Sequence, residues 1–272
     1  MKDITYLDIP RFIPEFSHRY GENVHLLASP VLLSLLARLG SPETVQPAIT
    51  QLVERLYTHL LRAVLDIEFP RKSVRIPTRM KELHPQEGFY EGEIIDPDTP
   101  CVVVSLARAG VIPSQHCYME LSDLLSPERV RQDFILMNRV TNEANEVIGA
   151  KIAGFKIGGG IEDAIVLIPD PMGATGGSLC RVLDLYAQEF PGTPKRWVAM
   201  NLIVTPEYLH RIRSEHPEVV VYALRLDRGL SDAHVLQSIP GTYPEGERGL
   251  NDHQYIVPGA GGLGEVFNNS FV

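Results

Sequence analysis

The chain has 272 residues, of which 44% are apolar and 22% are charged, proportions that are ordinary for a soluble globular protein. We expect a single domain over residues 1–272, because a chain of this length buries roughly three quarters of its extended surface. Lysine and arginine number 25 against 34 aspartates and glutamates, which gives a net charge of −9. This balance argues against a nucleic-acid or anionic-membrane surface, since both need a broad basic face.

The cysteines and the first residues predict a cytoplasmic protein. Cys101, Cys117 and Cys180 have no paired spacing, which is typical of reduced thiols and unlike a disulfide framework or a metal motif. The opening MKDITYLDIPRF lacks the apolar run of a secretory leader. The longest apolar stretch is interrupted by Pro30 and is too short to span a membrane.

The first hundred residues predict an arm and two helices. Residues 1–22 contain Pro10 and Pro14 and predict an irregular arm. Helical spacing of apolar residues predicts helices over 31–39 and 42–66, the second beginning with Ser41 as N-cap and Pro42 at the first helical position. The charged, proline-bearing stretch from 71 to 100 predicts no regular element.

After residue 100 the pattern changes to short apolar runs rich in β-branched residues. These runs predict strands at 101–107, 133–140, 149–157, 164–168, 197–204 and 219–226. The two strands within 133–157 flank a polar turn and predict a hairpin, and apolar stripes predict helices at 178–190 and 206–215. Strands alternating with helices predict an α/β fold, with a mostly parallel sheet flanked by helices on both faces. Ligands bind such sheets beyond the carboxyl ends of the strands.

The segment IPDPMGATGGS, residues 168–178, joins a predicted strand to a predicted helix. Its glycines let backbone N–H groups converge on an anion, and the helix start adds unpaired donors and a positive dipole end. Thr175 and Ser178 add hydroxyl donors that suit a phosphate, whereas the Asp170 carboxylate suits the vicinal hydroxyls of a ribose. The loop therefore predicts a sugar-phosphate site. The alternative is an ordinary strand-to-helix turn, in which the glycines only allow the chain to turn tightly.

This loop resembles the ribose-5-phosphate loop of type I phosphoribosyltransferases. Within them it is most similar to the uracil phosphoribosyltransferase family, whose loop typically reads DPMLATGGS. The resemblance implies that the loop binds phosphoribosyl pyrophosphate (PRPP) through Asp170, Pro171, Met172, Gly173, Ala174, Thr175, Gly176, Gly177 and Ser178. Gly173 stands where the family usually has leucine, and we expect this change to loosen the turn.

Three further segments resemble the family in the same order. SLARAG at 105–110 is similar to the family's LRAG, which makes Arg108 a contact for the pyrophosphate of PRPP. ILMNRV at 135–140 is similar to the segment at the base of the family's flexible hood, which makes Arg139 the second such contact. Residues 249–266 resemble the base-binding loop GLNExGYIVPGLGDAGDR. The motifs cover about 100–266, whereas the first 20 residues and an insertion at 228–248 lie outside the family pattern.

The base-binding loop departs from the family at one position. The resemblance implies that backbone groups of Ile256, Gly261 and Leu263 read uracil, and that residue 262 lies beside both uracil and the ribose of PRPP. The family has aspartate there, and this chain has Gly262. A lost hydrogen bond to a charged group costs about 1.5–3 kcal/mol, or roughly ten- to a hundredfold in rate. Glu265 and Asp252 are the acids whose side chains could reach the ribose instead.

The resemblance implies the reaction of uracil with PRPP to give UMP and pyrophosphate, with Asp170 and Arg108 as the principal catalytic residues. Mg²⁺ would enter with PRPP and need no ligand from the protein. The family also implies a homodimer or a larger homo-oligomer. Two alternatives stay open: a phosphoribosyltransferase for another base, which the altered loop permits, and a non-catalytic sensor that binds PRPP or a nucleotide.

Overall fold

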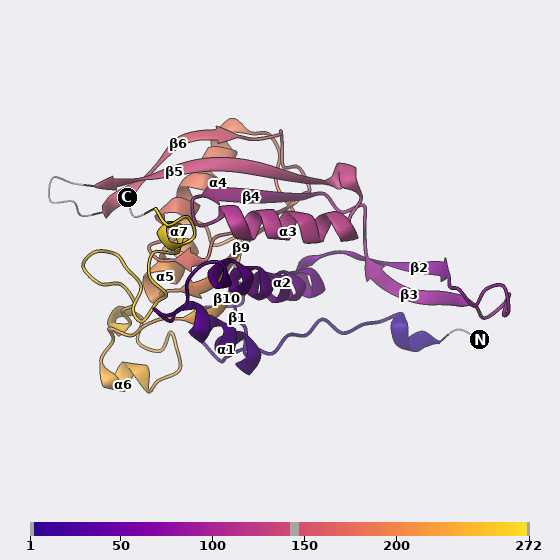
Figure 1. Cartoon of the computed structure of the whole chain (residues 1–272), viewed down its shortest axis with the longest axis horizontal. Helices are drawn as coiled ribbons and strands as arrows, with labels where there is room; N and C mark the ends of the chain where they lie inside the picture. Colours follow the sequence, from indigo (N-terminus) through magenta and orange to yellow (C-terminus); the bar gives the residue numbers. More distant parts are fainter. Residues whose placement is uncertain (1–2, 142–146, 271–272) are drawn as a thin grey trace.

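A central sheet forms the body of the molecule (Figure 1). The computed structural model describes residues 3–141 and 147–270, without the side chains of residues 139–141 and 147–150. The strand order is β1-β10-β9-β7-β4-β5-β6, and β8 pairs with β9 beside this path. The strands are β1 (Val24–Leu26), β4 (Cys101–Ala107), β5 (Val130–Thr141), β6 (Val147–Lys156), β7 (Ile165–Pro169), β8 (Met172–Gly173), β9 (Arg196–Val204) and β10 (Val219–Leu226). Neighbouring strands are parallel except β5 and β6, which form an antiparallel pair, so the predicted mostly parallel sheet and the hairpin strands are confirmed.

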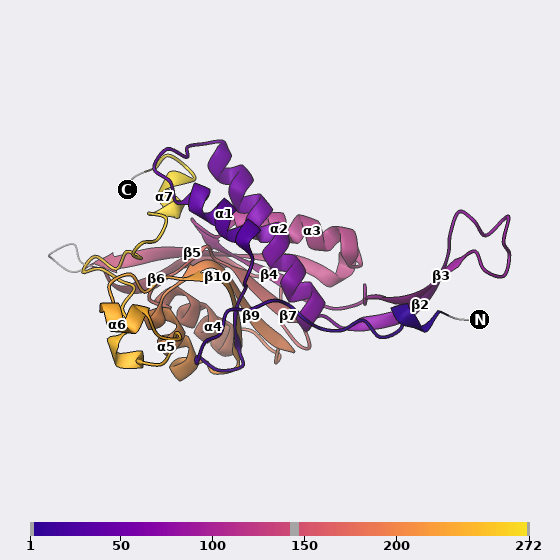
Figure 2. The ribbon, with the colours of Figure 1, turned by 90° about the horizontal axis from the view of Figure 1, so that it is seen from below.

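Helices cover both faces of this sheet, as Figure 2 shows. On one face lie α1 (Pro30–Leu39), α2 (Ala48–Glu68) and α3 (Val111–Leu124), and on the other lie α4 (Gly177–Glu189) and α5 (Pro206–Glu215). Each face has its own buried apolar cluster, with Leu56 and Leu121 in the first and Leu183 and Leu209 in the second. The shorter helices are η1 (Ile4–Tyr6), η2 (Pro127–Arg129), α6 (Ala233–Leu236), η3 (Pro244–Gly246) and α7 (Leu263–Val266).

Helix α5 has the predicted bounds, whereas the predicted start of α2 is wrong. Thr205 caps α5 by accepting a hydrogen bond from the Tyr208 N–H, and Pro206 occupies the first turn. The predicted helix over 42–66 instead begins at Ala48, directly after Pro47. A proline inside a helix removes one hydrogen bond and clashes with the preceding turn, so Pro47 sets the start of the helix.

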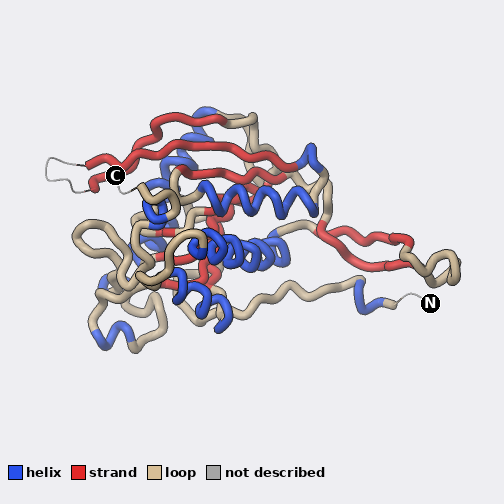
Figure 3. The backbone as a smooth tube through the Cα atoms, in the orientation of Figure 1, coloured by secondary structure: helices blue, strands red, loops and turns tan. Residues whose placement is uncertain are grey.

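A two-stranded antiparallel sheet that the sequence did not indicate stands out from the body (Figure 3). It consists of β2 (Arg71–Pro77) and β3 (Phe89–Ile95). Arg75 lies 2.6 Å from a carboxylate oxygen of Glu91 and stacks 3.3 Å above the Phe89 ring, so charged side chains form part of the pairing. Among the described residues, no helix is both long and apolar enough to cross a membrane.

The contact that most constrains the centre of the sheet lies at Gly110, between β4 and α3. Strands β4 and β7 pair in parallel, with Val103 opposite Leu167, so the segments that follow the two strands leave the sheet at the same edge. A Cβ atom built on Gly110 would lie 2.8 Å from the carbonyl oxygen of Leu106 and 2.9 Å from that of Pro169. Only glycine lets the loop after β4 lie this close to the end of β7.

We predict that Gly110→Ala lowers the free energy of unfolding by about 1–3 kcal/mol, because backbone atoms must move to admit the methyl group. Thermal or denaturant unfolding measures the loss. Gly154→Ala is the matched control, since its Cβ would meet a single atom, the Leu136 Cδ1, at 3.9 Å. An equal loss in both variants, or none at Gly110, would contradict the assigned role of the close approach.

Candidate active site

Two of the predicted motifs meet at the carboxyl ends of β4 and β7. Arg108 follows β4 directly and Asp170 follows β7 directly, so the paired strands place the two residues on neighbouring loops. The Arg108 side chain is exposed, and its Nη1 donates a hydrogen bond to the carbonyl oxygen of Ser270 at 3.1 Å. The peptide bond between Ala107 and Arg108 is cis. The structure thus places Arg108, the predicted pyrophosphate contact, at the same edge of the sheet as Asp170, the predicted ribose contact.

The loop 170–178 is held at its start by β9. The Asp170 N–H donates to the carbonyl oxygen of Met200 at 3.1 Å, and the Asn201 side-chain amide donates to the carbonyl oxygen of Asp170 at 2.7 Å. Thr205 binds the middle of the loop, since its hydroxyl donates to the carbonyl oxygen of Ala174 at 2.6 Å. The Gly177 N–H donates to the Thr175 hydroxyl at 3.3 Å, where α4 begins. These carbonyl contacts fix the loop from behind, at the amino end of a 13-residue helix, the part of a helix that attracts anions.

Gly173 does not loosen this turn, contrary to our expectation. It is buried in β8, and its carbonyl oxygen accepts a hydrogen bond from the Thr205 N–H at 3.1 Å. A Cβ on Gly173 would lie 2.9 Å from Val204 Cγ1 and 3.2 Å from the Tyr208 ring. The aromatic ring from α5 therefore fills the space into which a larger residue at 173 would project.

The Asp170 carboxyl group lies half-buried at the mouth of the loop. Burial raises its pKa to about 6, because removal from water disfavours the charged form, while a hydrogen bond from the Met172 backbone acts in the opposite direction. The carboxylate therefore predominates only above about pH 6. A carboxylate at this place can accept hydrogen bonds from two adjacent hydroxyl groups.

The segment that we predict to bind the base is fastened to the sheet by an ion pair at the end of β10, whose carboxylate is buried. Arg225 contacts the Asp227 carboxylate at 2.5 and 2.7 Å, and that carboxylate also accepts the Gly259 N–H at 2.7 Å. The side chains of Ile256 and Leu263 are buried, so their backbone groups are the parts left to face a ligand. A Cβ built on Gly264 would lie 3.3 Å from the Ala109 nitrogen, which places α7 against the loop of Arg108.

The side chain of Glu265, three residues further along in α7, places a carboxylate beside Gly262. A Cβ built on Gly262 would lie 2.7 Å from Glu265 Oε2, so the glutamate already occupies the space beside the glycine. Asp252 lies beside the predicted phosphate loop instead: it lines a cavity of about 570 Å³ together with Thr175, Arg211 and Arg248. Of the two acids considered from the sequence, Glu265 is the one that reaches residue 262.

Arg139 lies in β5, where its backbone pairs with Ala150 of β6. Its side chain lies outside the part of the chain that the structure describes. The pairing of Ala107 with Leu136 places the Arg139 backbone three residues beyond the end of β4. Its predicted contact with pyrophosphate stays a prediction.

The residues that position the loop were missed in the sequence. Asn201, Thr205 and Tyr208 lie in or after β9, and the Tyr208 hydroxyl donates to the Asn201 side-chain oxygen at 3.1 Å. The sequence contains a signal for these residues: they are polar and lie in or just after an apolar strand. Polar residues at the carboxyl end of a parallel strand lie at the ligand-binding edge of the sheet.

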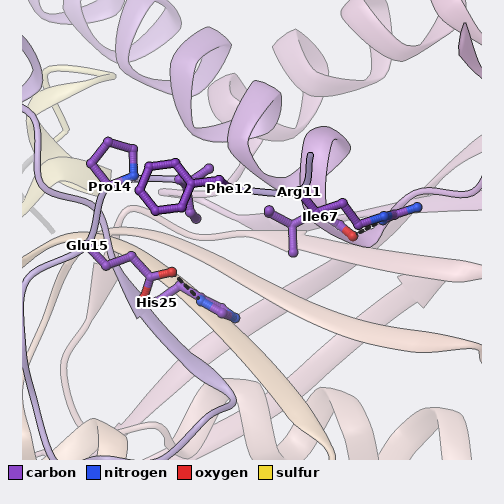
Figure 4. A pocket seen from close by; sticks show the side chains of 7 residues that line it. Arg11, Phe12, Pro14, Glu15, His25 and Ile67 are labelled. Atoms are coloured by element: carbon purple, nitrogen blue, oxygen red, sulfur yellow. Dashed lines mark hydrogen bonds and ion pairs between the residues drawn. The ribbon is translucent and has the colours of Figure 1, made fainter. Parts of the chain in front are cut away.

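A larger cavity, about 670 Å³, lies away from these motifs, along the N-terminal arm (Figure 4). The arm contributes Arg11, Phe12, Ile13, Pro14 and Glu15, which face His25 of β1 and Ile67 of α2. The Glu15 carboxylate contacts His25 Nδ1 at 3.0 Å. None of the residues predicted for PRPP or uracil lines this cavity.

Comparison with known proteins covers most of the chain. The family model described as uracil phosphoribosyltransferase matches residues 26–249, a range that contains Arg108, Arg139 and the loop 170–178 and ends before Ile256. The uracil phosphoribosyltransferase of Thermococcus sibiricus is 25% identical over 240 residues, covering 87% of this chain and 85% of that protein. The one from Pyrococcus furiosus is 24% identical over 237 residues, covering 86% and 92%.

A shorter alignment and a solved structure complete the comparison. The uracil phosphoribosyltransferase of Thermococcus kodakarensis is 35% identical over 100 residues, which span 37% of this chain and 34% of that protein. The AQ2163 protein from Aquifex aeolicus has the same fold, with a TM-score of 0.64 and 23% identity over 89% of this chain and 96% of that one. The expected α/β fold is confirmed, and the chain belongs to the uracil phosphoribosyltransferase family.

Proposed function

We propose that the chain transfers the ribosyl 5-phosphate of PRPP to uracil, forming UMP and pyrophosphate, and that residues 1–272 act as a single phosphoribosyltransferase domain. The observation that carries the proposal is that three of the predicted motifs meet at one edge of the sheet. Gly110 touches the end of β7, Gly264 touches Ala109, and Thr175 lines one cavity with Asn251. Membership of the family supports the choice of uracil and PRPP.

In the proposed reaction, the bond from the anomeric carbon to the pyrophosphate oxygen breaks and a bond to a uracil nitrogen forms. Backbone N–H groups of Thr175, Gly176 and Ser178 bind the 5-phosphate, and Asp170 accepts hydrogen bonds from the ribose hydroxyls. Arg108 and Arg139 neutralise the leaving pyrophosphate. These contacts align the anomeric carbon with the base, which converts binding free energy into orientation. The uracil proton leaves to solvent.

Mg²⁺ fits this site as a companion of PRPP. It prefers oxygen ligands and often binds through substrate phosphates. Its oxygens would come from PRPP, and Asp170 beside the loop is left to accept the ribose hydroxyls. When bound, the ion would neutralise charge on the pyrophosphate.

The base is the least constrained part of the proposal. The matched family region ends at residue 249, before the segment of Ile256 and Leu263. Recognition by the backbone of this segment suits a small ring with alternating donors and acceptors. A different base therefore remains the second candidate, and a panel of bases belongs in the assay.

We predict uracil-dependent release of pyrophosphate from PRPP and Mg²⁺. Asp170→Asn and Arg108→Ala lower the rate by roughly ten- to a hundredfold or more, as expected for the loss of hydrogen bonds to charged groups. Arg129→Ala is the matched control for Arg108, because Arg129 is exposed at the opposite edge of the sheet, just before β5.

In the unmodified chain, we predict that kcat/KM falls as the pH drops below about 6, since Asp170 then becomes protonated.

The outcomes separate the candidates. Release with another base, but not with uracil, would reject uracil and retain the phosphoribosyltransferase. Binding of PRPP without release with any base would reject the enzyme in favour of a nucleotide or PRPP sensor. Equal rates for Arg108→Ala and Arg129→Ala would reject the proposed role of Arg108.

We propose that Glu265 provides the carboxylate beside the ribose in place of residue 262. Its Oε2 lies 2.7 Å from the Cβ position of Gly262, at the start of α7, which packs against Ala109. The glutamate is half-buried, so its charge is only partly screened by water.

We predict that Glu265→Ala lowers kcat/KM by roughly ten- to a hundredfold, the cost of one charged hydrogen bond. The paired variant Gly262→Asp with Glu265→Ala restores most of the activity, since it returns a carboxylate to the same space. Gly262→Asp alone is expected to impair activity, because the new side chain would crowd Glu265. Glu245→Ala, at an exposed glutamate of η3, is the control. Failure of the pair to recover any activity would remove Glu265 from this role.

We propose a homo-oligomer of at least two copies, and a cytosolic location. The projecting strands and the turn that joins them expose Ile76, Met80 and Leu83 at 45%, 47% and 74%, a line of apolar side chains that a second copy would cover. The three cysteines are free and buried, which supports a reducing compartment.

We predict that sedimentation equilibrium gives at least twice the chain mass of 30.3 kDa. Replacing Ile76 and Leu83 by serine reduces this mass, because it removes apolar contact area from the projecting strands and their turn. Leu236→Ser in α6 is the control, since Leu236 is 44% exposed on another part of the surface. A monomeric mass for the unmodified chain would refute the proposal.

A further inference from the structure

Helices α4 and α5 bring together side chains of three metal-binding types, none of them among the residues predicted to bind PRPP or uracil. Cys180, Glu215 and His216 each offer a ligand atom, and these atoms lie within 4.8 Å of one another. Cys180 is buried, His216 is half-buried, and Glu215 is exposed, so the cluster is anchored inside and reachable from solvent.

A fourth donor lies on the same helix face as the cysteine. Asp184 follows Cys180 by four residues in α4, the spacing that places two side chains on one side of a helix. Its Oδ1 lies 3.8 Å from His216 Nε2. Glu215 is the last residue of α5 and His216 is its C-cap, so two donors come from each side of the gap between the helices.

His216 also has the partner that a metal-binding histidine usually needs. Its Nδ1 lies 3.5 Å from Glu218 Oε1, on the opposite side of the ring from Asp184. A carboxylate on the second ring nitrogen fixes the orientation of a ligating histidine and strengthens its binding. Three carboxylates, Asp184, Glu215 and Glu218, lie in or beside the cluster, and Arg211 lies next to it with its Nε 3.0 Å from Glu215.

We propose that Cys180, Glu215 and His216 form a binding site for a divalent cation of intermediate softness, with Zn²⁺ as the natural occupant and a fourth position open to Asp184 or water. One sulfur, one imidazole nitrogen and one carboxylate oxygen make a donor set that suits Zn²⁺, whereas Mg²⁺ and Ca²⁺ take oxygen ligands. Cys180 binds as the thiolate, and its proton passes to solvent. The ion ties α4, whose first residues carry the phosphate loop, to the end of α5.

The test uses Co²⁺ as a coloured substitute for Zn²⁺ on the full chain. We expect a sulfur-to-cobalt charge-transfer band in the near ultraviolet, together with visible bands of tetrahedral intensity, and loss of both on addition of Zn²⁺. Cys180→Ser abolishes the charge-transfer band. Glu218→Gln weakens cobalt affinity by roughly ten- to a hundredfold, the usual effect of removing the carboxylate behind a ligating histidine.

Control variants keep the result interpretable. Cys117→Ala removes a buried thiol that lies elsewhere in the core, and His234→Gln removes an exposed histidine of α6. Both controls retain the spectrum. Zn²⁺ raises the unfolding temperature of the unmodified chain but not that of His216→Gln. This measurement tests the site even if Cys180→Ser fails to fold. Absence of a thiolate band, or a band that survives Cys180→Ser, overturns the site, as does a Zn²⁺ shift unchanged by His216→Gln.

Discussion

The parallel pairing of β4 with β7 is the constraint on which the rest of the site depends. It brings two loops to one edge of the sheet, and the close approach of Gly110 to the Pro169 carbonyl group keeps them in contact. Helix α7 then packs against Ala109, so the C-terminal segment joins the same edge. Segments far apart in the chain thereby meet at one edge of the sheet. A side chain at position 110 would clash with the Pro169 carbonyl oxygen, so this geometry requires glycine there.

Much of this arrangement is predictable, because local patterns carry it. The strand of residues 101–107 has the predicted bounds, as does the helix of residues 206–215, where Thr205 and Pro206 mark the start. The position of Asp170 at the end of a buried strand follows from the same reasoning, since parallel strands end at a common ligand-binding edge. In these segments the local preference and the tertiary structure agree, which is why the sequence suffices.

The misses share a physical cause: interactions between distant residues outweigh the local pattern. β5 starts at Val130 rather than 133, because Val130 pairs with Cys101 of β4. Asp133, a polar residue within this strand, is buried and accepts hydrogen bonds from Arg131 and Tyr186. Tyr208, 35 positions along from Gly173, fills the space beside it. Glu265 places a carboxylate beside residue 262, where this chain has glycine. Glu265 lies three residues after position 262, and its longer side chain spans that distance. The position of a carboxylate in space is therefore not fixed by its position in the sequence.

The electrostatics of the predicted phosphate loop would favour a polyanion although the chain has a net charge of −9. The local field comes from backbone N–H groups and the amino end of α4, which carry partial positive charge whatever the net charge of the chain. Arg211 adds to it: Nη1 lies 3.2 Å from the Cβ position of Gly177, while Nε contacts Glu215. A cation held by Glu215 would compete for that contact. Because Arg211 touches both the loop and Glu215, occupation of the metal site would alter the field at the phosphate without any movement of the sheet.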